Sequence, residues 1–245
     1  MKKLSFTLLL STFLFGCNQQ ASQQSAEPET PAEDWIILFD GSSLDKWHGY
    51  NNDDAMHDEW TIQDGAMVFT PGEEGGKNIV TDENFTNFVL SLEWKISEGG
   101  NSGIFWGVYE DTIYSEAYLT GPEIQVLDNE RHPDAKVAGK LHQAGALYDM
   151  IEPGADVANP AEEWNTCVIT IDHTRNYGAV ELNGTQLMEF PVHGADWDAM
   201  VAKSKFAEWE GFAKYQTGKI GLQDHSDIVS YRNIKIKRLA EDPES

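Results

Sequence analysis

From residue 35 to residue 239 the chain alternates apolar and polar positions in short runs, and turn residues separate one run from the next. In the clearest run, Phe88–Ile96, every second residue is apolar, which predicts a strand with one buried face. The pair Asn183-Gly184 lies between two such runs and predicts a tight hairpin turn. Residues 196–215 do not alternate, and we expect a short helix or an ordered loop there.

These runs predict an all-β domain. The predicted strands are residues 36–39, 60–63, 66–69, 88–96, 102–108, 123–127, 145–149, 165–172, 178–182, 185–190, 218–223 and 230–238. Many short strands joined by turns favour an antiparallel sandwich or a jelly roll. We therefore expect a single domain over residues 35–239, with Leu90, Leu92 and Trp94 in its core and residues 240–245 as a tail.

The N-terminus is typical of a bacterial export signal. Lys2 and Lys3 precede an apolar run, Leu4–Phe15, that is too short to span a bilayer. The sequence at residues 14–17, Leu-Phe-Gly-Cys, resembles the lipobox of bacterial lipoproteins. This resemblance implies a signal peptide over residues 1–16, cleavage before Cys17 and lipid attachment to Cys17. The alternative is an ordinary secretory signal with a chance cysteine.

Residues 17–34 continue from this cysteine as a polar segment rich in Gln, Ser, Glu and Pro, which we expect to be a flexible linker. The predicted protein is therefore held in the bacterial cell envelope, on the periplasmic or outer-membrane face, by its lipid anchor and without a transmembrane helix. The sequence indicates no oligomeric state.

The net charge and the amino-acid composition of the chain limit the classes of ligand that we expect it to bind. The formal net charge is −24, and a strongly acidic protein is repelled by nucleic acids and anionic polysaccharides. Aromatic residues make up 11% of the chain, with eight Trp, and a neutral carbohydrate is the ligand class that this composition favours. Apart from Cys17 the chain has one cysteine, Cys167, in an alternating run, so we expect a core residue and no disulfide or thiolate metal site.

Polar residues recur along the predicted strand 123–127. Glu123 and Gln125 share one face of it, and Asp128 falls on the other face unless a bulge intervenes. A retaining glycosidase needs two carboxyl groups about 5–5.5 Å apart. Because Gln125 is neutral and Asp128 has a short side chain, this spacing does not favour that mechanism. The alternative is that all three are hydrogen-bonded structural residues.

A second polar group surrounds the turn between predicted strands 218–223 and 230–238. It combines a carboxylate, an imidazole and a guanidinium with an amide, on Gln223, Asp224, His225 and Arg232. A hydrophobic core does not need such a grouping, which therefore predicts a polar ligand bound on a sheet.

The polar face of residues 88–96 carries Glu93 and Lys95, and Asn101 follows it directly. Glu93 and Lys95 are explained equally well as a binding pair or as a solvated face. The sequence has no His-x-His or His-Glu-x-x-His spacing, so it specifies no metal site; a divalent cation remains possible.

A set of motifs follows one another in order along the chain: Leu38–Trp47, Asn84–Ile96, Asn101–Ile104, Glu123–Asn129, Ala144–Asp149, Glu163–Asn165, Leu182–Gly184 and Gly218–Ile236. Together they resemble the 3-keto-disaccharide hydrolase domain family. The resemblance implies a concanavalin-like jelly roll and activity on sugars that are oxidised at the third carbon.

Such a substrate can be cleaved by β-elimination of its leaving group followed by hydration, which needs a base, a donor for the enolate and an acid. We expect Glu123 or His225 to be the base, and Lys95, Arg232 or a divalent cation to stabilise the enolate. The alternative function is a non-catalytic glycan-binding module, or a scaffold on the same fold. One pocket is expected to be surrounded by Glu93, Lys95, Asn101, Glu123, Gln125, Gln223, His225 and Arg232, with Asp128 and Tyr148 nearby.

Overall fold

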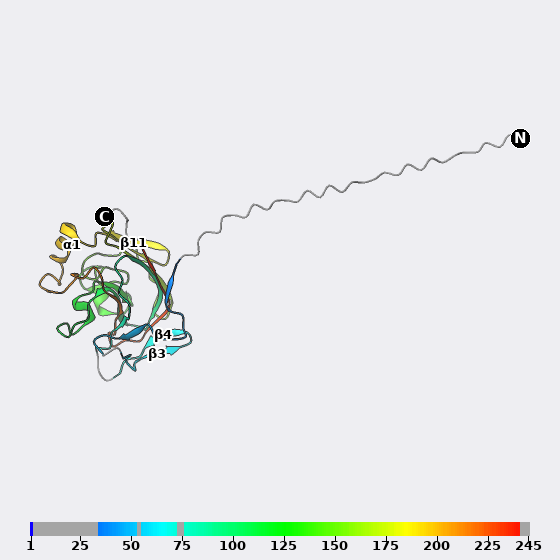
Figure 1. Ribbon diagram of the computed structural model, residues 1–245, viewed down its shortest axis with the longest axis horizontal. Coiled ribbons are helices and arrows are strands. Elements are labelled where there is room, and N and C mark those ends of the chain that lie inside the picture. The colour runs from blue at the N-terminus through cyan, green and yellow to red at the C-terminus, as the bar shows by residue number, and fades with distance from the viewer. Residues whose placement is uncertain (2–33, 53–54, 73–75, 241–245) are drawn as a thin grey trace. The chain divides into compact units, whose positions relative to one another are not determined.

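The computed structural model describes Met1 and residues 34–52, 55–72 and 76–240 (Figure 1). The predicted signal peptide, Cys17 and the tail beyond residue 240 lie outside the described residues, apart from Met1. The chain divides into two units, residues 1–32 and 33–245, and every described strand and helix belongs to the second. No described helix is both long and apolar enough to cross a membrane.

Two antiparallel sheets build the second unit. The larger sheet contains, in spatial order, β11 (Thr185–Phe190), β10 (Tyr177–Leu182), β9 (Asn165–Asp172), β6 (Phe88–Ile96), β13 (Val229–Arg238), β4 (Ala66–Phe69) and β3 (Trp60–Gln63), and β1 (Ile36–Phe39) also pairs with β13. The smaller sheet has the order β2 (Trp47–Gly49), β5 (Ile79–Thr81), β12 (Lys219–Leu222), β7 (Asn101–Val108) and β8 (Glu123–Leu127). This arrangement confirms the predicted jelly-roll sandwich of concanavalin-like type.

Alternation along the strands creates the core between the sheets. Leu90, Leu92 and Trp94 of β6 are each only 1% exposed, as predicted, and the residues between them are half-buried. One hydrogen bond also crosses the core, because the Ser102 hydroxyl lies 2.8 Å from the Tyr231 hydroxyl of the larger sheet. Each sheet therefore packs its apolar face against the other and turns its second face outward.

The structure departs from the predicted elements in a few short segments. The strands β2 and β5 have only three residues each, too few for alternation to be recognised. The predicted strand 145–149 is wrong: its described residues make only isolated bridges. The expected helix is α1 (Gly194–Val201), which turns follow, and two short 3₁₀ helices are η1 (Ala117–Leu119) and η2 (Pro133–Lys136).

Candidate active site

The outer face of the smaller sheet forms the floor of a pocket. In β8, Ile124 and Val126 point into the core, so Glu123 and Gln125 point outward. Gly103 of β7 lies directly opposite Gln125, and a Cβ at this glycine would overlap the Glu123 carboxylate. The glycine thus provides the space in which the Glu123 side chain lies across the sheet.

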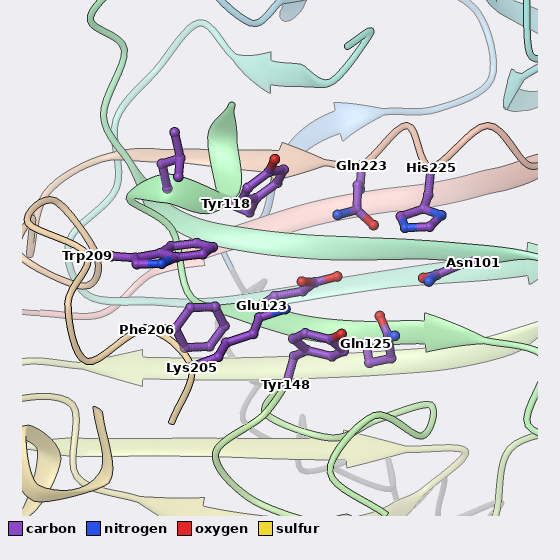
Figure 2. Close-up of a pocket in the computed structure, with 11 residues that line it drawn as sticks. Asn101, Tyr118, Glu123, Gln125, Tyr148, Lys205, Phe206, Trp209, Gln223 and His225 are labelled. Atoms are coloured by element: carbon purple, nitrogen blue, oxygen red, sulfur yellow. The ribbon is translucent and has the colours of Figure 1, made fainter. Parts of the chain in front are cut away.

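Loops around this floor complete a pocket of about 410 Å³ (Figure 2). In Figure 2 Phe206 and Trp209 lie toward one end of the pocket, and Gln223 and His225 toward the other, with Glu123 between them. An aromatic end and a polar end fit a sugar, whose ring faces are apolar and whose edge carries hydroxyls. The lining residues are Asn101, Tyr118, Leu119, Glu123, Gln125, Tyr148, Lys205, Phe206, Trp209, Gln223 and His225.

Glu123 is the carboxylic acid of this pocket, and its pKa is strongly raised. Its side chain is buried, and burial raises the pKa of its carboxyl group to about 8, although the charge of Lys205 opposes the rise. With its amide oriented by the surrounding hydrogen bonds, Gln125 donates to Glu123 Oε1 over 3.1 Å and to the Ser102 carbonyl over 2.9 Å. Such a carboxyl group exchanges its proton near neutral pH, as a general base requires.

Tyr148 forms part of the pocket wall, and a chain of buried and half-buried polar groups holds it there. The Tyr148 hydroxyl donates to Asp134 Oδ2 over 3.0 Å. The ring of His142 stacks on the Tyr148 ring, with the two ring centroids 4.4 Å apart. The two ring nitrogens of His142 each lie 2.9 Å from a carboxylate oxygen, one of Asp134 and one of Asp149. Burial, followed by the hydrogen bond to Asp134, raises the pKa of Tyr148, which therefore keeps its proton at neutral pH.

Residues 145–148 place Tyr148 by following the free edge of β8. Gly145 N donates to Gln125 O over 2.9 Å, and Tyr148 N donates to Glu123 O over 3.0 Å. The positive φ values of Gly145 (81°) and Asp149 (58°) interrupt the extended backbone at both ends of this segment. This explains why the sequence resembles a strand here although the structure forms only a bridge.

Lys205 is the cation of the pocket that the sequence analysis missed. Its backbone N–H donates to Asp149 Oδ2 over 2.6 Å, and its ammonium group lies 4.2 Å from the centre of the Tyr148 ring. The sequence analysis also did not assign Tyr118, Leu119, Phe206 and Trp209 to the site. The only signal for the last two was their position in residues 196–215, a segment without strand periodicity.

Two amide oxygens at the polar end have no hydrogen-bond partner among the described residues. They are Asn101 Oδ1 and Gln223 Oε1, on side chains that are 5% and 6% exposed. Because an unsatisfied buried acceptor is costly, these oxygens are suited to accept hydrogen bonds from a ligand's hydroxyl groups.

The expectation of one shared pocket is wrong for three residues. Glu93 and Lys95 of β6 and Arg232 of β13 lie on the outer face of the larger sheet, which the core separates from the pocket. There Arg232 Nε donates to Glu93 Oε2 over 2.8 Å, and its guanidinium lies 3.9 Å from the centre of the Trp164 ring. Alternation placed these side chains away from the core, but it did not show which sheet faces the ligand.

Asp128 also lies outside the pocket lining. It follows β8, is buried, and accepts hydrogen bonds from the backbone N–H groups of Gly99 (2.8 Å) and Glu130 (3.0 Å). Burial alone would raise its pKa, but these bonds and those from Arg131 outweigh burial, and the pKa is lowered. Asp128 therefore holds two turns together. The structure brings the other six predicted residues into one pocket: Asn101, Glu123, Gln125, Tyr148, Gln223 and His225.

The fold and this pocket define a concanavalin-like sandwich with a candidate active site on its smaller sheet. The chain belongs to the 3-keto-alpha-glucoside-1,2-lyase-like domain family, which it matches over residues 34–237. This assignment confirms the resemblance that the sequence motifs indicated.

Similarity to individual proteins supports this family assignment. The chain is 34% identical to a 3-keto-disaccharide hydrolase of Bacteroides thetaiotaomicron, over 89% of this chain and 83% of the relative. It is also similar to a solved structure from Parabacteroides distasonis ATCC 8503 described as a glycosyl hydrolase, with 30% identity and a TM-score of 0.76 over 84% of this chain and 94% of the other. A second structure from the same organism, with the same description, has 25% identity and a TM-score of 0.64 over 84% and 99% of the two chains.

Proposed function

We propose that this protein is a glycoside-cleaving enzyme that acts on 3-keto-glycosides, by β-elimination of the leaving group followed by hydration. The observation that carries this proposal is the number of carboxyl groups in the pocket lining. Among the described residues that line it, Glu123 carries the only carboxyl group, and the residue beside it on the same face is the neutral Gln125. A mechanism with a nucleophile and an acid needs two carboxyl groups, whereas elimination needs a single base.

The ketone supplies the reactivity that an unmodified sugar lacks. A carbonyl at C3 acidifies the hydrogen on C2, and the Glu123 carboxylate accepts this proton. The electron pair of the C2–H bond forms the enolate and then the C1–C2 double bond, and the C1–O bond to the leaving group breaks. Addition of water, with OH at C1 and H at C2, returns the sugar, and the sum of both steps is hydrolysis.

Other pocket groups fit the remaining roles. Lys205 and Tyr148 offer an N–H and an O–H donor for the oxygen of the enolate, and they take the place of Lys95 and Arg232 in this role. His225, at the polar end, is the candidate acid that protonates the departing oxygen.

The test is a comparison of matched substrates. The full chain is incubated with a 3-keto-glucoside and with the same glucoside before oxidation, each with and without a chelator. We expect release of the leaving group from the ketone only. In D₂O the sugar product should carry deuterium at C2, above the exchange measured for the free 3-keto sugar without protein.

Two results would contradict the proposal. Equal cleavage of the unoxidised glucoside would show an ordinary glycosidase. Binding of the intact glycan without turnover of either compound would show a carbohydrate-binding module.

A further inference from the structure

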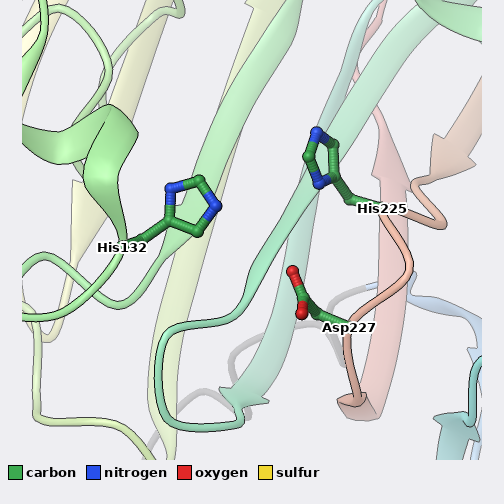
Figure 3. A group of neighbouring side chains, drawn as sticks. All are labelled: His132, His225 and Asp227. Atoms are coloured by element: carbon green, nitrogen blue, oxygen red, sulfur yellow. The ribbon is translucent and has the colours of Figure 1, made fainter.

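A group of three polar side chains (Figure 3) includes His225, which lies at the polar end of the pocket. It consists of His132, which precedes η2, and of His225 and Asp227 in the loop between β12 and β13. One polar atom from each side chain lies within 4.8 Å of those of the other two. His225 also lines the pocket, so a ligand in the pocket has direct access to this group, which we call the His–His–Asp cluster.

The backbone holds the two sides of the cluster in place. Ser226, between His225 and Asp227, has a φ of 63°, and its N–H donates to Asp224 Oδ1 over 2.7 Å. Asp224 is itself tied to the neighbouring loop, because its other oxygen accepts from Lys77 N over 2.9 Å. On the opposite side, His132 caps η2 by accepting a hydrogen bond at Nδ1 from Asp134 N over 3.1 Å.

These bonds determine what the cluster offers to a ligand. Since Nδ1 of His132 accepts a hydrogen bond, the neutral ring carries its hydrogen on Nε2, the nitrogen that faces His225 in Figure 3. Asp227 Oδ2 accepts from Asn101 N over 3.0 Å, while no hydrogen bond to its Oδ1 is found among the described residues. The cluster therefore presents an N–H donor and a carboxylate acceptor toward the same space.

A metal ion fits this arrangement less well than a hydroxyl group. A histidine binds a metal through an unprotonated nitrogen and donates through the other, which is the reverse of the state that Asp134 N imposes on His132. A hydroxyl group both accepts and donates. An oxygen placed between atoms that are at most 4.8 Å apart can lie about 2.8 Å from each of them, which is hydrogen-bond distance.

We propose that the His–His–Asp cluster is the leaving-group subsite and binds a hydroxyl of a second sugar ring. His132 Nε2–H donates to this hydroxyl and Asp227 accepts from it, while His225 is the member of the cluster that also lines the pocket for the oxidised ring. The inference rests on the proposed function and assigns residues to one part of it: His132 and Asp227 distinguish a leaving group that carries a hydroxyl from one that carries none.

Two conservative substitutions isolate these contacts. His132→Asn keeps an oxygen that can cap η2 but removes the Nε2–H donor. Asp227→Asn keeps an oxygen for Asn101 N but replaces the free carboxylate oxygen with an NH₂ group. The matched control is His193→Asn, because His193 also precedes a helix, α1, and does not line this pocket.

Steady-state kinetics are measured for the full chain on a 3-keto-disaccharide and on a 3-keto-nitrophenyl glucoside. We expect both cluster variants to lower kcat/KM for the disaccharide by roughly tenfold or more, mainly through KM, as loss of a hydrogen bond to a charged or buried group would. The aryl substrate should be unaffected, and the control should match the unsubstituted chain on both.

Several outcomes would overturn the inference. An equal loss on both substrates would place the cluster at the oxidised ring or in the support of the fold, and no loss on either would exclude contact with substrate. Calorimetric binding of Zn²⁺ to the full chain that both variants abolish would show a metal site instead.

Turnover of neither ketone by the unsubstituted chain would contradict the proposed function rather than the cluster. In that case, binding of the unoxidised disaccharide and of the unoxidised aryl glucoside is measured by calorimetry. Weaker binding of the disaccharide by both variants supports the subsite. Unchanged binding of the disaccharide overturns it.

Discussion

At the scale of single residues, the chemistry of this site depends on one buried carboxyl group. Glu123 lies in a space that Gly103 leaves open, and burial raises the pKa of the carboxyl group to about 8. The same environment has two separate consequences, one for catalysis and one for folding, and each can be measured.

The first consequence is the pH dependence of turnover. A general base must be ionised, so Glu123 should give kcat/KM for a 3-keto-glycoside a limb that rises with pH and has its midpoint at about pH 8. Glu123→Gln should remove this rising limb and lower turnover by roughly two or more orders of magnitude. A rate that falls through the same pH range would show that Glu123 acts as an acid.

A substitution at His225 should affect catalysis without affecting folding. Its side chain is exposed, so His225→Ala should leave the far-ultraviolet circular dichroism spectrum and the thermal midpoint unchanged. Turnover of 3-keto-glycosides should fall by roughly two or more orders of magnitude if it protonates the leaving group. Normal turnover by both His225→Ala and Glu123→Gln would place the active site elsewhere.

The second consequence of Glu123 concerns stability. Its pKa is about 8 in the folded protein and 4.5 in the reference state. Between these values the unfolded chain has lost the proton that the folded chain keeps, so the free energy of unfolding decreases as the pH rises through this window. Relative to Glu123→Gln, which does not titrate, the protein should lose on the order of 4 kcal/mol between pH 4 and pH 9.

Urea denaturation of both proteins at the two pH values measures this difference, because other titrating groups cancel in the comparison. A difference that does not change with pH would mean that the folded Glu123 titrates like an exposed glutamate.

At the scale of elements, alternation predicts the long strands well and the short ones poorly. The bounds of β6 and β9 agree with the predicted ones, because eight or nine residues with one buried face give an unambiguous period. The three-residue strands β2 and β5 are buried on both faces and carry no period. Residues 145–148 have a strand-like sequence and lie along the edge of β8, but they form only bridges there. The local sequence does not distinguish this arrangement from a full strand.

The strand β6 offers a direct test of the sandwich. Leu92 is 1% exposed in the core, so Leu92→Ala should lower the free energy of unfolding by roughly 2–5 kcal/mol. Val89 of the same strand is only half-buried, and Val89→Ala should cost clearly less. Equal effects of the two substitutions in urea denaturation would contradict the assigned faces of β6.

At the scale of the whole molecule, the sequence predicted the pocket floor and the polar end of the pocket, but not its aromatic end or its lysine. The motif around Glu123 and Gln125 identified the floor because both residues lie on one strand. Glu93 and Lys95 have the same outward alternation, yet they lie on the other sheet, and only the packing of the two sheets distinguishes the two cases. Lys205 reaches the pocket from a segment without periodicity, so no local pattern indicated it.

The attachment of the domain to a membrane is the remaining prediction at this scale, and it depends on Cys17, outside the described residues. If the cysteine carries a lipid, Cys17→Ser should move the protein from the membrane to the soluble fraction, because the acyl chains provide the affinity and the polar linker that follows provides none. Mass spectrometry of the N-terminal peptide should show the acyl groups on the unsubstituted protein alone. Cys167→Ser is the matched control: this thiol is buried in β9, so its replacement should not change fractionation. Membrane association that survives Cys17→Ser, together with an N-terminal peptide without acyl mass, would show that the segment is an ordinary secretory signal.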